Sequence, residues 1–169
     1  MWVLVGEKFV CVRIAGRASL TSSIDFKTLV SELRRRGYGY FVIDLSQCSL
    51  MDSTFLGVLA GFGLKMGGVQ KEGIDRAVEL FNPNPRVTEL LESLGVLHLF
   101  KLTQGSLEMP EATQTTVQCP TGATREELAR ACLEAHQTLM SLNPENASRF
   151  KDVSQFLAKD LQNLKSGAG

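Results

Sequence analysis

Short apolar runs alternate with segments of helical spacing along residues 1–103. Runs rich in β-branched and aromatic side chains are typical of strands. The nearly continuous apolar run at Tyr40–Leu45 favours a central strand buried on both faces. The predicted strands are Trp2–Val5, Phe9–Ile14, Tyr40–Leu45, Ala77–Phe81 and Leu97–Leu102, and the first two flank Gly6-Glu7 as an opening hairpin.

Apolar residues that recur three and four positions apart predict helices at 25–36, 53–66 and 85–94. Gly37 and Gly95 end the first and third of these, and Pro85 suits a first helical position. The element order is therefore β-β-α-β-α-β-α-β. Such alternation predicts an α/β fold with a mixed, largely parallel β-sheet, right-handed crossovers and helices packed on the sheet.

The remaining chain divides into a polar stretch and a pair of helices. Residues 104–123 are rich in Thr, Gln, Gly, Pro and Glu without periodicity, which indicates a linker or strap. In the C-terminal extension, residues 124–169, the pattern predicts helices from Thr124 to Leu142 and from Pro144 to Lys165, with a capping box formed by Thr124 and Glu127. We expect a C-terminal α-hairpin that packs on the main domain, on a second copy in a homodimer, or on a partner.

Composition narrows the class of protein. The chain has 169 residues, 44% hydrophobic and 21% charged, with a formal net charge of zero. These values fit a soluble globular protein, and the zero net charge argues against a nucleic-acid partner. No apolar stretch reaches the roughly 20 residues that a membrane span requires. The first residues lack the basic-then-apolar pattern of a signal peptide, so we expect a cytoplasmic protein.

Residue types that support catalysis or metal binding are sparse. The four cysteines form no CxxC pair and suggest no zinc site: Cys11, Cys48, Cys119 and Cys132. His98 and His136 have no recognisable nucleophile or metal spacing, and the sequence order places neither near Ser53. A hydrolase with Ser53 as nucleophile would need a general base in reach. We therefore expect no enzyme activity, catalytic residue, metal or cofactor.

The segment from Val42 to Leu59 carries the most specific motif. An apolar strand ends in Asp44, a short loop follows, and then come Asp52-Ser53-Thr54, a variable position, Leu-Gly and an apolar helix. This pattern resembles the signature of the STAS domain, the family of the anti-sigma-factor antagonists. The stretch from Asn84 to Gly95 is similar to the third helix of that family. The resemblance extends over residues 1–103, while residues 104–169 have no counterpart in the minimal domain.

The resemblance implies a bacterial signalling protein that controls transcription by partner switching. In anti-sigma-factor antagonists, the serine after the aspartate is phosphorylated by an anti-sigma factor that is also a serine kinase, and a serine phosphatase resets the cycle. By position, Asp52 matches the aspartate, Ser53 the phosphorylated serine and Thr54 the alternative hydroxyl. The expected partner-binding residues are Asp52, Ser53, Thr54, Phe55, Leu56, Ser22 and Ser23.

Alternative interpretations stay open at this stage. Asp, Ser and Thr are also ordinary helix caps, whatever the function. Phe55 replaces a glycine that many members of the family have, which favours a constitutive protein-binding or lipid- or ligand-binding module without phosphorylation. Asp44 is either an acceptor that orients the following loop or part of the docking face.

Overall fold

The computed structural model describes residues 1–67, 77–106, 114–115 and 122–166. Within them, one six-stranded sheet has the order β5-β4-β3-β2-β1-β6. The strands are β1 (Trp2–Val5), β2 (Phe9–Ala18), β3 (Tyr40–Met51), β4 (Ala77–Phe81), β5 (Lys101–Thr103) and β6 (Gln114–Thr115). The helices are α1 (Leu20–Arg35), α2 (Ser53–Lys65), α3 (Pro85–Ser93), α4 (Arg125–Leu142) and α5 (Ala147–Ser166), with 3-10 turns η1 (Leu97–Leu99) and η2 (Pro144–Asn146).

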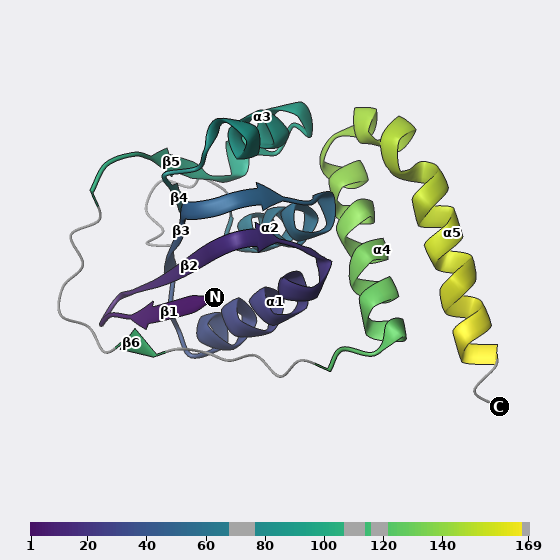
Figure 1. Cartoon of the computed structure of the whole chain (residues 1–169), viewed down its shortest axis with the longest axis horizontal. Helices are drawn as coiled ribbons and strands as arrows, with labels where there is room; N and C mark the ends of the chain where they lie inside the picture. Colours follow the sequence, from purple (N-terminus) through teal and green to yellow (C-terminus); the bar gives the residue numbers. More distant parts are fainter. Residues whose placement is uncertain (68–76, 107–113, 116–121, 167–169) are drawn as a thin grey trace.

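The predicted fold class is confirmed. Strand β1 pairs antiparallel with β2 and β6, whereas β2, β3, β4 and β5 pair in parallel. The sheet is therefore mixed and largely parallel, and α1 and α2 pack against it (Figure 1).

Aromatic side chains join the sheet to these two helices. The ring of Phe26 on α1 lies 5.2 Å from that of Phe55 on α2, between centroids. Phe62 of α2 meets Phe41 of β3 edge to face at 4.9 Å. Edge-to-face and tilted pairs add to the stability gained by burial of the rings. This cluster fixes α2, and with it the start of α2, relative to the sheet.

Several element boundaries differ from the predictions, among them the start of the last helix, since Pro144–Asn146 forms η2 and α5 begins at Ala147. Leu97–Leu102 is not one strand, because Leu97–Leu99 forms η1 and only Lys101–Thr103 pairs in the sheet. Leu99 and Phe100 are buried against α2, where Phe100 approaches Gly63, so their apolar character reflects helix contacts. Strands β2 and β3 continue beyond their predicted ends as a paired ribbon to Ala18 and Met51.

Helix α1 also begins earlier than predicted, at Leu20. A capping box between Ser19 and Ser22 satisfies its first backbone N–H groups, although Ser22 is not the Glu or Gln usual there. Of the predicted linker 104–123, residues 107–113 and 116–121 lie outside the described residues, and Gln114–Thr115 forms β6 beside β1.

The predicted C-terminal hairpin is present and packs on the same chain. Helix α4 lies against α2 and α1, and α5 lies on the outer side of α4 (Figure 1). The capping box of Thr124 and Glu127 is confirmed. At the turn, the buried Nδ2 of Asn146 donates to the carbonyl oxygens of Leu94 and Leu139, at 3.0 and 2.9 Å. These bonds anchor the hairpin to the end of α3.

Candidate functional site

The junction between β3 and α2 is organised by Asp52. Its Oδ1 accepts a hydrogen bond from the N–H of Phe55 at 2.8 Å, which caps α2. Its Oδ2 accepts from the N–H of Leu20 at 2.9 Å, at the first residue of α1. The N–H of Asp52 donates to the carbonyl of Ala18 at 3.0 Å. One side chain therefore holds the starts of two helices together at the end of the sheet.

Ser53 is the first residue of α2 and is half-buried. Its Oγ lies 3.1 Å from Nε2 of His136, on α4. The expectation that no histidine lies near Ser53 is therefore wrong. The imidazole is only 5% exposed and stacks on Phe150 of α5, with ring centroids 4.6 Å apart. Packing of α4 on α2 brings together two residues that are 83 positions apart in the chain.

Thr54, the next residue of α2, is buried and also contacts α4. Its Oγ1 lies 3.3 Å from Sγ of Cys132, and that sulfur lies 3.7 Å from Nδ1 of His136. Burial lowers the pKa of His136, with a smaller opposing effect from the carboxylate of Asp52. The imidazole is therefore held neutral between the two helices.

Four of the expected partner-binding residues are buried. Phe55 and Leu56 are fully buried in the core, because their side of α2 packs on the sheet and on α1. Thr54 is covered by α4, and the buried hydroxyl of Ser23 donates to the carbonyl of Leu20. In this structure, these four side chains are therefore not available on the surface for a partner to contact.

The other three expected residues, Asp52, Ser53 and Ser22, are partly exposed and lie at the starts of α2 and α1. The remaining candidate contact surface is therefore small. It consists of two helix starts beside the middle of α4, where Cys132 and His136 lie.

The pair of Ser53 and His136 has the separation of a serine and its general base. The second ring nitrogen of the histidine faces the thiol of Cys132, and the carboxylate of Asp52 is engaged by backbone N–H groups. Among the described residues, no carboxylate therefore orients the imidazole by a hydrogen bond. Within the described ranges, no group of three or more His, Cys, Asp or Glu side chains could hold a metal ion.

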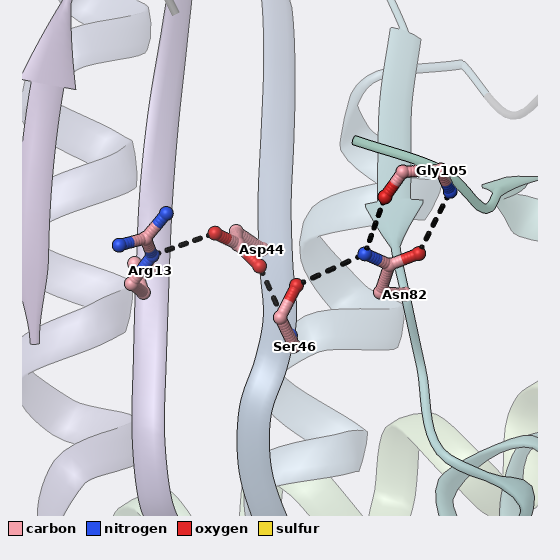
Figure 2. Close-up of polar contacts among 5 residues, drawn as sticks. All are labelled: Arg13, Asp44, Ser46, Asn82 and Gly105. Carbon is pink, nitrogen blue, oxygen red and sulfur yellow. Dashed lines mark hydrogen bonds and ion pairs between the residues drawn. The ribbon is translucent and has the colours of Figure 1, made fainter. Parts of the chain in front are cut away.

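Asp44 lies in the middle of β3 and not at its end, since β3 runs on to Met51. Figure 2 shows its carboxylate between Arg13 of β2 and the following residues of β3. Arg13 Nε donates to Oδ2 at 2.7 Å, and the N–H of Ser46 donates to Oδ1 at 3.0 Å. Burial would raise the pKa of Asp44, but these bonds outweigh it and lower the pKa. The geometry favours the structural interpretation of Asp44.

The same network extends to the end of β5 (Figure 2). Asn82 Nδ2 donates to Ser46 Oγ at 3.2 Å and to the carbonyl of Gly105 at 3.0 Å. The N–H of Gly105 donates back to Asn82 Oδ1 at 3.0 Å. Asn82 has a φ of 50°, which asparagine tolerates better than most residues. These bonds tie the ends of β4 and β5 to β3.

Two further observations concern thiols and membranes. Cys11 and Cys48 are buried and free, and Cys119 lies outside the described residues. None of the helices in the described part of the chain combines the length and apolar character needed to cross a bilayer.

Comparisons with known proteins agree on the fold. The family model for the STAS domain matches residues 3–109. A solved structure of the anti-sigma factor antagonist SpoIIAA in its unphosphorylated form is similar with a TM-score of 0.50 and 17% sequence identity. The similarity covers 63% of this chain and 88% of that one. No curated protein matches the chain. The family match ends before α4, so the hairpin is an addition to the matched fold.

Proposed function

Because the chain belongs to the STAS domain family, we propose that it is an anti-sigma-factor-antagonist-like regulator that binds an anti-sigma factor with serine kinase activity while Ser53 is unmodified. The kinase phosphorylates Ser53 and the complex dissociates. A serine phosphatase then restores the unmodified form. The protein works in the bacterial cytoplasm by binding, without catalysing a reaction of its own.

The position of Ser53 is the observation that carries this proposal. It follows Asp52 directly and is the first residue of a helix of 13 residues. Free N–H groups and the positive end of the helix dipole favour an added phosphate at such a position. The similarity to an antagonist that has an unphosphorylated form supports the same class of switch.

The physical effect of the phosphate is electrostatic. It adds a charge of about −1.5 to −2 at neutral pH beside the carboxylate of Asp52. A partner that covers this surface would bury a charge without a counterion, which is unfavourable. A loss of about 1.4 kcal/mol already weakens binding tenfold. The domain itself stays folded, because Ser53 lies at its edge.

The test is phosphorylation of the full chain in its native cell, measured as intact mass under activating and resting conditions. We expect one phosphate in one of the two conditions and none in the Ser53→Ala variant. Thr54→Val is the matched control: Thr54 is buried, so this variant should keep the phosphate. Phosphate that persists in Ser53→Ala would contradict the assignment of the site.

One observation favours a second candidate function. The hydroxyl of Ser53 is already paired with His136. A constitutive STAS module that binds a protein, lipid or other ligand without phosphorylation would have this arrangement throughout. A single unmodified mass under both conditions, with unchanged partner binding in Ser53→Ala, would favour this candidate.

A further inference from the structure

Helix α4 covers the same end of α2 at which the proposed switch lies. His136 contacts the hydroxyl of Ser53, and Cys132 contacts that of Thr54. Between these two positions on α4, Glu134 accepts a hydrogen bond from Lys27 Nζ of α1 at 2.6 Å. The covered surface therefore includes α1 and α2 together.

The approach of α4 depends on a glycine of α2. A Cβ placed on Gly57 would lie 2.5 Å from the carbonyl oxygen of Ala135, which is closer than real Cβ atoms come. The backbone of α4 thus rests directly on Gly57. A Cβ on Gly61, one turn later, would meet only the side chain of Thr138, at 3.6 Å or more, which is an ordinary contact.

The buried side of α4 is made mostly of small residues. Ala131 and Ala135 are buried there, and Leu139 is the one large aliphatic side chain of α4 with no exposed surface in the described residues. The interface also includes His136, Leu142 and Phe150, yet it buries fewer large aliphatic side chains than the core of the sheet does. Helix α5 lies on α4 and away from the sheet (Figure 1), so the two helices form one unit, which the contacts of α4, Asn146 and Phe150 attach to the domain.

From these contacts we infer that the α4–α5 hairpin is an intramolecular gate over Ser53. In the closed form, α4 takes the place of the partner on α1 and α2 and shields the serine hydroxyl from a kinase. When the hairpin opens, the partner surface on α1 and α2 and the hydroxyl of Ser53 are both exposed. The inference rests on the proposed function, which identifies the partner as an anti-sigma factor with kinase activity. The partner surface that fits is a helix with small residues spaced like Ala131 and Ala135, because only such a helix can approach Gly57.

The experiment compares Gly57→Ala with Gly61→Ala in the full chain. Both changes add the same methyl group to the same helix, but only the first meets the backbone of α4. Amide hydrogen exchange of α4 should become at least about tenfold faster in Gly57→Ala and stay unchanged in Gly61→Ala. Exchange of β3 should be unchanged in both variants, which shows that the domain remains folded.

A second measurement reads access to the site directly. In a Ser53→Cys background, modification of residue 53 by a bulky polyethylene glycol maleimide is followed by peptide mass spectrometry. Gly57→Ala should accelerate it by about tenfold or more, and Gly61→Ala should not. Ala135→Leu opens the contact from the α4 side and should match Gly57→Ala, so the test does not depend on one variant.

Two results would overturn the gate. In the first, the amide hydrogens of α4 in the unaltered chain exchange as slowly as those of β3, which would show that the hairpin is part of the core. In the other, Gly57→Ala and Ala135→Leu leave the labelling rate of residue 53 unchanged. A failure of the proposed function would look different. Faster labelling of residue 53 in these variants, combined with no phosphate on Ser53 in the native cell, would support the gate and contradict the kinase as partner.

Discussion

Replacement of Asp52 should destabilise the fold because its carboxylate bonds two helices. In Asp52→Ala, α2 loses its cap at Phe55, which costs about 0.5–2 kcal/mol in comparable helices. The partly buried N–H of Leu20 also loses its acceptor, at about 1–3 kcal/mol. We expect a total loss of about 2–4 kcal/mol in the free energy of unfolding.

Asp52→Asn separates the two contributions. Asparagine is an equally good cap, so its remaining oxygen keeps the bond from Phe55. Its amide nitrogen then faces the N–H of Leu20, donor against donor. The loss should therefore be about half of that in Asp52→Ala. The exposed Glu89→Gln is the control for a change from carboxylate to amide, and should stay within about 0.5 kcal/mol of the unaltered chain.

Urea denaturation followed by circular dichroism measures these differences. With a slope of about 2 kcal/mol/M, the midpoint of Asp52→Ala should fall by about 1–2 M. Equal midpoints for Asp52→Ala and Asp52→Asn would show that the bond to Leu20 carries all of the effect. A midpoint of Asp52→Ala within experimental error of the unaltered chain would refute the double cap.

Three further predictions follow from the geometry. Because burial lowers the pKa of His136, the closed hairpin should lose stability as the pH falls below the ordinary value of 6.5; the protection factors of α4 amides, which correct for the intrinsic exchange rate, should fall in acid, and this fall should disappear in His136→Gln. Asp44→Asn should lower the free energy of unfolding at neutral pH by about 1–3 kcal/mol. Because the pKa of Asp44 is lowered in the folded state, its contribution to stability is present above the unfolded pKa and is lost as the pH falls through the folded pKa. Urea titrations at several pH values would measure this loss. A fluorophosphonate reagent should leave Ser53 unlabelled by peptide mass spectrometry, and an adduct there would revive a catalytic role for its pair with His136.

Local chemistry made most of the main domain predictable from the sequence. The strand at Ala77–Phe81, the first helical position at Pro85 and the capping box of Thr124 and Glu127 depend on neighbours in the chain. The start of α2 at Ser53 was predictable for the same reason. The strand predicted at Leu97–Leu102 failed because a short apolar run does not distinguish sheet pairing from helix contacts.

The contact between α4 and α2 could not be predicted with the same means. Ser53 and His136 are distant in the chain, and their approach depends on how a separate hairpin packs. The glycines of α2 were a partial signal, since they indicate close approach by another element. Combined with Ala131 and Ala135 on a predicted helix, Gly57 would have suggested the pairing.

The covered end of α2 has a consequence for measured affinities. When a binding surface is free only in a minor population, the observed dissociation constant rises by the inverse of that population. Opening of the hairpin exposes at least Leu139, and the exposure of one such side chain costs about 1.5–3 kcal/mol. A truncated protein that ends before α4 would thus bind the same ligand roughly tenfold to a hundredfold more tightly than the full chain, and titrations on such a fragment would overstate the strength of the complex in the cell.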